Sequence, residues 1–278
     1  MQPTEPAVRT PLLHFFLITF AFTWLIWSAP VLDAVSSFSL PGPNIAWIGI
    51  GAHGPLVAAL VLAYRNGGWA AAKRLLRSGF DLRMRATWWL LLIVVPVALG
   101  GVAVWLSSSF HDYQPDLSLL EQPLLIVPLS FFMFFLGGSV QEEFGWRGFA
   151  LPRLLEFQNP LMASLVLGLI WGVWHLPLFF MTGVSQEYMS FAVFLPLTVA
   201  FSLLFTWAYL RTSLNLFSAL LLHTTINTSL NLFPPVELEA GGERSAMIYL
   251  LLLYLVTATI VVVRERKLFF NVQRRPSD

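Results

Sequence analysis

Eight apolar runs, each about as long as the hydrocarbon core of a bilayer requires, constrain this chain more than any other feature. A membrane-spanning helix satisfies its backbone hydrogen bonds internally, and 57% of the residues are hydrophobic while only 11% are charged. We therefore predict an all-α fold, a polytopic transmembrane helical bundle of about eight spans, forming a single membrane domain over residues 1–278. The runs cover about residues 11–33, 44–64, 87–107, 124–150, 160–181, 190–210, 213–232 and 246–263.

The charged residues between the runs sort by side, although the formal net charge is only +1. The positive-inside rule then predicts a multi-pass protein of the cell membrane with both termini in the cytoplasm. The cations of the predicted cytoplasmic side are Arg9, Arg65, Lys73, Arg74, Arg77, Arg83, Arg85, Arg147, Arg153, Arg211, Arg264, Arg266, Lys267, Arg274 and Arg275. The opposite connectors hold Arg244 and the acids Asp33, Asp112, Asp116, Glu121, Glu187, Glu237, Glu239 and Glu243.

One cytoplasmic connector has an amphipathic pattern. Residues 69–80 mix Ala, Leu and Trp with Lys73, Arg74 and Arg77. This pattern predicts a short cytoplasmic amphipathic helix that lies on the membrane surface.

Several polar residues fall inside the apolar runs, where ionisable groups are costly and indicate function. A helix rises about 1.5 Å per residue, so depth follows from the distance to the predicted cytoplasmic turns. Glu142, His175, His223 and Asn227 then lie about 20, 22, 15 and 21 Å from that side. We expect three helices to bring these four groups into one layer within the bilayer.

Helical spacing divides the roles of these residues. His223 and Asn227 are separated by four positions and share one face of their helix. Glu143 and Arg147 have the same spacing and are expected to form an ion pair that supports the site.

Glu142 points about 100° away from Glu143 around the predicted helix, toward the side that carries Gly138 and Gly145. Small neighbours leave room for water. We therefore predict Glu142 as the reactive carboxylate.

The residue types exclude several hydrolase mechanisms, because the sequence has no Cys, no HExxH motif and no G-x-S-x-G motif. Glu142 with His175 can take a proton from water, while His223 and Asn227 donate hydrogen bonds to an oxyanion. Equally, Glu142, His175 and His223 form a three-ligand set for a divalent metal ion such as zinc, with a fourth position open for water. Both mechanisms stay open at this point.

Residues 142–148 (EEFGWRG), 171–175 and 223–227 resemble the three successive motifs EExxxR, FxxxH and HxxxN of the CPBP family. This family includes CAAX prenyl proteases and bacteriocin-processing (Abi) proteins. The motif-bearing catalytic core covers about residues 124–232. The resemblance implies an intramembrane protease in which Glu142 and His175 activate water and His223 and Asn227 hold the oxyanion or a metal ion. Trp171 stands where the pattern has Phe, and we expect this exchange to alter the pocket's shape more than its chemistry.

We therefore predict an intramembrane endopeptidase that hydrolyses a membrane-tethered peptide or protein, contacts the lipid bilayer and has no nucleic-acid partner. A site reached from the cytoplasmic half of the bilayer would suit such a substrate. One alternative is a proton-coupled transporter that uses Glu142, Glu143 and His175 as a relay. Another is a non-catalytic membrane scaffold or immunity protein whose polar cluster holds helices together.

Overall fold

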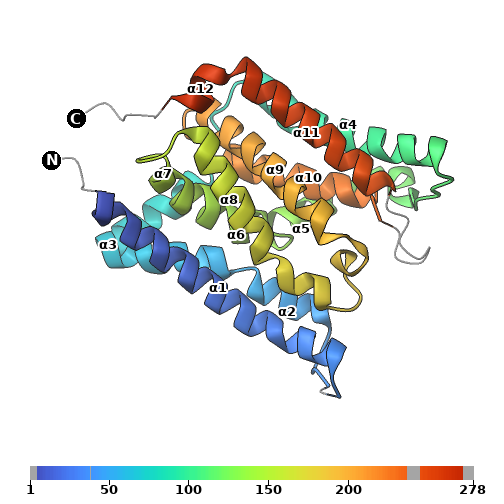
Figure 1. Cartoon of the computed structure of the whole chain (residues 1–278), viewed down its shortest axis with the longest axis horizontal. Coiled ribbons are helices and arrows are strands. Elements are labelled where there is room, and N and C mark those ends of the chain that lie inside the picture. Colours follow the sequence, from blue (N-terminus) through green and yellow to red (C-terminus); the bar gives the residue numbers. More distant parts are fainter. Residues whose placement is uncertain (1–4, 38, 237–244, 272–278) are drawn as a thin grey trace.

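A computed structural model gives the fold of residues 5–37, 39–236 and 245–271, with only the backbone described for residues 5–10. Helices lie side by side in one bundle, and no strand occurs in the described ranges (Figure 1). This confirms the predicted all-α transmembrane bundle.

The described residues form twelve α-helices and four short 3-10 or π-helical segments. The α-helices are α1 (Glu5–Val35), α2 (Asn44–Gly51), α3 (Gly54–Ser78), α4 (Ala86–Phe110), α5 (Pro123–Phe135), α6 (Ser139–Gly145), α7 (Leu151–Leu154), α8 (Pro160–Trp174), α9 (Phe191–Arg211), α10 (Leu216–Leu232), α11 (Ser245–Arg264) and α12 (Arg266–Phe270). Four single turns join them: η1 (Ser118–Glu121), the π-helical η2 (Trp146–Ala150), η3 (Leu176–Phe180) and η4 (Ser185–Tyr188).

The number of spans is close to the prediction. In the described ranges, seven helical segments are long and apolar enough to cross a membrane. The remaining predicted run forms α10, a helix of 17 residues that packs against α4, α5, α6 and α9. Because α10 connects the end of α9 with the segment before α11, it adds an eighth passage along the bundle to these seven segments.

The fourth predicted span, residues 124–150, is not one continuous helix, and the prediction was wrong in this respect. Its helix α5 ends at Phe135, and α6 begins at Ser139. Between them Gly138 has a φ of 111°, a conformation that side chains with a Cβ rarely adopt. The hydropathy of the sequence does not indicate this interruption of the helix, because apolar residues lie on both sides of it.

The predicted amphipathic helix is present as the second half of α3, which ends at Ser78. Gly67 and Gly68 depart from helical geometry and separate it from the spanning half. Lys73, Arg74 and Arg77 are exposed there, whereas Ala72 is buried. The segment thus presents charge on one side and packs with the other.

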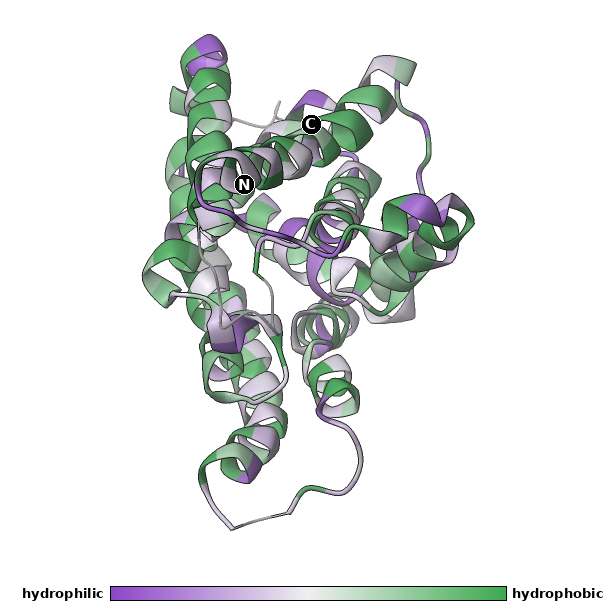
Figure 2. Cartoon of the chain, turned by 90° about the vertical axis from the view of Figure 1, so that its right-hand side faces the viewer, coloured by the Kyte–Doolittle hydropathy of each residue, from purple (hydrophilic) through white to green (hydrophobic). Residues whose placement is uncertain are grey.

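The two ends of the bundle differ in charge. We call the end at which α1 and α4 begin the basic end, and the end at which they finish the acidic end, which faces the viewer in Figure 2. In the described connectors the acidic end has no Lys or Arg and holds Asp33, Asp112, Asp116, Glu121 and Glu187. The described cations of the basic end include Lys73, Arg74, Arg77, Arg83, Arg85, Arg153, Arg211, Arg264, Arg266 and Lys267. Glu237, Glu239, Glu243, Arg244, Arg274, Arg275 and the side chain of Arg9 lie outside the described residues.

An aromatic column links α1 to the centre of the bundle. Phe15 of α1 stacks on Phe149 with ring centroids 5.3 Å apart and meets Trp146 edge-on at 5.5 Å. Trp146 contacts Trp174 at 5.8 Å, and Trp174 contacts Trp27 of α1 at 4.8 Å. All five rings are buried, so α1 is fixed against the helices that carry the polar residues.

Candidate active site

A side chain stabilises the backbone turn between α5 and α6. The Gln141 Oε1 atom accepts a hydrogen bond from the Gly138 N–H at 2.7 Å, and its Nε2 donates to the Leu136 carbonyl at 3.1 Å. Backbone groups freed by the turn are thereby satisfied. Our sequence reasoning gave Gln141 no role, although an amide beside two glutamates in an apolar run was a visible signal.

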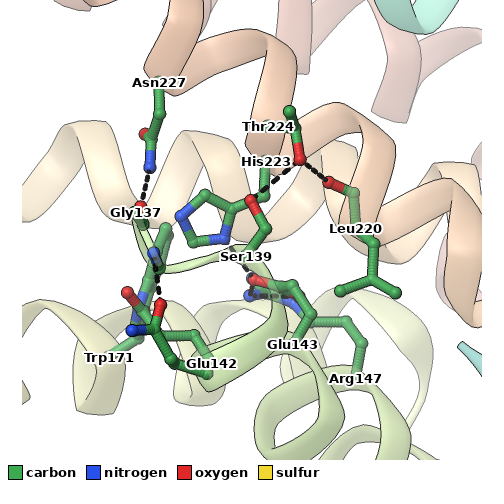
Figure 3. Close-up of polar contacts among 12 residues, drawn as sticks. Gly137, Ser139, Glu142, Glu143, Arg147, Trp171, Leu220, His223, Thr224 and Asn227 are labelled. Atoms are coloured by element: carbon green, nitrogen blue, oxygen red, sulfur yellow. Dashed lines mark hydrogen bonds and ion pairs between the residues drawn. The ribbon is translucent and has the colours of Figure 1, made fainter. Parts of the chain in front are cut away.

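Glu142 follows this turn and is only 5% exposed. Its Oε2 accepts a hydrogen bond of 2.5 Å from the indole Nε1 of Trp171 (Figure 3). Phe has no such donor. The expectation that Trp171 changes the shape of the pocket more than its chemistry was therefore wrong, because its N–H holds one oxygen of the carboxylate.

The space above Gly138 is surrounded by polar atoms. A Cβ atom on this glycine would lie 2.7 Å from Glu142 Oε1, 3.2 Å from His223 Nε2 and 3.6 Å from Asn227 Nδ2. An oxygen atom at the same point would lie within or close to hydrogen-bond distance of all three. The structure thus brings together side chains of α6 and α10 that are about 80 residues apart in sequence.

Glu143 points away from this space and binds Arg147 and His223. Arg147 Nη1 donates to both of its carboxylate oxygens at 2.8 and 3.0 Å, and His223 Nδ1 lies 2.8 Å from Oε1. Glu143 and Arg147 have no exposed side-chain surface. Since an ionised carboxylate only accepts hydrogen bonds, His223 carries a proton on Nδ1 and turns Nε2 toward Gly138.

Arg147 is surrounded mainly by aromatic rings. Its guanidinium lies 4.3 Å from the ring centroid of Phe205 and 5.0 Å from that of Trp171. Its Nε and Nη2 atoms are buried and have no hydrogen-bond partner among the described residues. Glu143 is therefore the acceptor that compensates this buried charge. The predicted ion pair between Glu143 and Arg147 is present.

Hydrogen bonds fix α10 to the turn before α6. Asn227 Nδ2 donates to the Gly137 carbonyl at 2.7 Å, and the hydroxyl groups of Thr224 and Ser139 are hydrogen-bonded at 3.0 Å (Figure 3). The sequence did not predict this contact between Thr224 and Ser139, since neither residue is ionisable. These two bonds set the distance between α10 and Glu142.

His175 ends α8 and lies on the wall of the same cavity. Its Nδ1 is 2.8 Å from the Trp171 carbonyl oxygen, so this hydrogen bond is not to Glu142. The His175 ring packs edge-on against Trp171, Trp174 and Phe194, with centroid distances of 5.5, 4.7 and 5.2 Å. Its Nε2 has no hydrogen bond to any described residue.

A cavity of about 970 Å³ contains these groups. Glu142, His175, His223 and Asn227 all line it, together with many apolar side chains of α2, α5, α9 and α11. It extends to residues of the acidic end, such as Asp116. The volume is enough for several residues of an extended peptide.

The predicted metal ligands do not form a metal-binding group in this arrangement. Within the described ranges, no three His, Asp or Glu side chains are placed so that they could hold one ion. The residues as placed do not fit a three-ligand zinc site.

Comparison with known proteins gives two matches. The family described as Type II CAAX prenyl endopeptidase Rce1-like matches residues 124–229. A curated protein of Methanococcus maripaludis is named CAAX prenyl protease 2. It is 24% identical to this chain over an alignment of 278 positions, which covers 92% of this chain and 95% of that protein. The matched residues 124–229 contain all six of the predicted site residues.

Proposed function

We propose that Glu142 activates the water molecule for peptide hydrolysis, since this chain belongs to the CPBP family of intramembrane proteases. The chain is an intramembrane endopeptidase. Family membership favours hydrolysis over the transporter and scaffold alternatives. The observation that carries the mechanism is the convergence of Glu142, His223 and Asn227 on the space above Gly138.

The first step needs a base beside a water molecule. Trp171 holds Glu142 Oε2, which leaves Oε1 to take a proton from water in the space above Gly138. The water oxygen then bonds to the carbonyl carbon of the substrate. His175 Nε2, on the wall of the same cavity, is a second group for proton transfer.

The second step needs donors for the oxyanion that the carbonyl oxygen becomes. Asn227 Nδ2 has a second N–H besides the one donated to Gly137, and His223 Nε2 donates when the ring carries both protons. When the tetrahedral intermediate collapses, the C–N bond breaks and the proton held by Glu142 passes to the leaving nitrogen. Glu143 and Arg147 position His223 throughout.

The substrate class follows from the relative and the lining of the cavity. The Methanococcus protein is named a CAAX prenyl protease, and the cavity of the present chain is lined mostly by apolar side chains. We infer a peptide or protein substrate held at the membrane by a lipid group or an apolar segment. Both kinds of substrate, lipid-anchored and anchored by an apolar segment, require a cavity that accepts apolar groups next to the scissile bond.

The orientation follows from charge. The described cations gather at the basic end, where α1 begins and α12 lies (Figure 1). The positive-inside rule favours a cytoplasmic position for this end and hence for both termini.

Cleavage of a membrane-tethered peptide library by the purified protein in liposomes tests the mechanism. We expect Glu142→Gln to lower kcat by about 10²- to 10⁴-fold, as for loss of a general base. Glu156→Gln is the matched control, because Glu156 is exposed and lies at the basic end. Full activity of Glu142→Gln, with the control also active, would refute the assigned role.

A further inference from the structure

The active-site cavity has its mouth at the acidic end of the bundle. Its exposed lining residues there come from four separate segments that follow or end spanning helices: Ile45, Asp116, Ser185 and Asn231. Its floor is formed by Glu142 and His223, which are 5% and 4% exposed. The path to the reactive groups thus begins where α1, α4 and α10 finish.

The opposite direction is closed by packed side chains. Between Glu142 and the basic end, the chain continues through Phe149, Leu151 and Leu154, which are 2%, 0% and 5% exposed. None of these three residues lines the cavity. A substrate therefore has no described route to Glu142 from the basic end.

Depth agrees with this asymmetry. Glu142 lies about 20 Å along the helix axis from the turn at the basic end, in a hydrocarbon core about 30 Å thick. It is consequently in the half of the bilayer nearer to the acidic end. A peptide coming from that side has the shorter distance to travel.

The charge of the mouth restricts what enters. The described cavity lining contains two carboxylates, Asp116 at the mouth and Glu142 at the floor, but no Lys or Arg. Acidic side chains of the substrate would meet no cationic partner there, and Asp116 would repel them. Apolar segments with neutral or basic flanks fit this lining better.

We propose that the substrate reaches Glu142 from the extracytoplasmic side, and that it is a polypeptide whose apolar, non-acidic segment lies at the outer leaflet. The inference rests on the proposed function and on the charge difference between the two ends of the bundle. It replaces the initial expectation of a site reached from the cytoplasmic half. The scissile segments are therefore those of exported or outer-leaflet polypeptides.

The absence of Cys from the sequence allows a direct test. Ser185→Cys at the mouth and Ser78→Cys at the basic end are matched substitutions of exposed serines. A membrane-impermeant maleimide applied to intact cells should label Ser185→Cys, and it should label Ser78→Cys only after permeabilisation. The reverse pattern would overturn the proposal.

A third variant tests whether the cavity itself is continuous with the outside. Leu230→Cys lies on the cavity wall, one turn of α10 beyond Asn227. A small impermeant thiosulfonate should modify it in intact cells. In a protein that carries both Ser185→Cys and Leu230→Cys, prior labelling at position 185 with a bulky maleimide should slow the modification at position 230 at least tenfold. Modification from the cytoplasmic side alone would contradict the proposed route.

The labelling results do not depend on catalysis, so they distinguish the access route from the mechanism. They should be the same in a Glu142→Gln background. In the active protein, right-side-out vesicles should cleave an externally added tethered peptide, whereas sealed inverted vesicles should cleave it only after detergent opens them. Cleavage by sealed inverted vesicles would refute extracytoplasmic access while leaving the peptidase activity established.

Discussion

Loss of the Glu143 charge should destabilise the protein more than any surface substitution. Glu143 and Arg147 are fully buried, and the two other guanidinium nitrogens of Arg147 have no hydrogen-bond partner among the described residues. Glu143→Gln leaves this cation uncompensated. Breaking one partner of a buried ion pair costs about 3–5 kcal/mol.

The magnitude can be measured as thermal unfolding of the purified protein in detergent. At about 2–4 °C per kcal/mol, the Tm of Glu143→Gln should fall by about 6–20 °C. Asp81→Asn is the matched control, because the ion pair between Asp81 and Arg83 is exposed. Its Tm should equal that of the wild type within the error of the measurement.

A double-mutant cycle isolates the pair itself. Glu143→Gln combined with Arg147→Met removes the buried cation together with its partner, so the double variant should be about 1–3 kcal/mol more stable than the sum of the single effects predicts. Additive effects within about 0.5 kcal/mol would refute the argument. They would mean that Arg147 is compensated by groups other than Glu143.

Three further outcomes are expected. Trp171→Phe keeps a ring but removes the hydrogen bond to Glu142, and a hydrogen bond to a charged group contributes about 1.5–3 kcal/mol. Steady-state kinetics with a tethered peptide should therefore show a kcat that is lower by about 10- to 10²-fold. An unchanged kcat would contradict this role. Gly138→Ala should abolish cleavage, since its Cβ would lie 2.7 Å from Glu142 Oε1, whereas Gly42→Ala has a similar positive φ with nothing within 4 Å and should stay active. If both lose activity equally, backbone strain and not the filled space is responsible. A strong chelator should leave the activity of purified protein unchanged, because no described group of three ligands could hold an ion; loss of activity that added zinc restores would refute the metal-free mechanism.

Local rules were enough to predict several contacts of the site. Four-residue spacing predicted the ion pair of Glu143 and Arg147, and helix rise placed Glu142 at the level of Asn227 on another helix. These rules work in a membrane because spanning helices run nearly parallel between two fixed planes. Depth in one helix can then be compared with depth in the next.

Features that depend on tertiary contacts could not be predicted in this way. The break at Gly138 is held by Gln141, and the role of Trp171 requires that α8 face α6 at the right height. The direction of the cavity depends on which gaps side chains fill. Neither hydropathy nor spacing contains that information.

The aromatic column has a consequence for how the enzyme is made. A chain emerges from the ribosome at about 5–20 residues per second, so Trp27 is in place about 7–30 s before its partner Trp174, which follows about 150 residues later. His223 follows later still. Between the synthesis of Glu142 and that of His223, the growing chain has the carboxylate but lacks the donors of α10 that complete the proposed site. The proposed site is therefore complete, and cleavage can begin, only after α10 has been made.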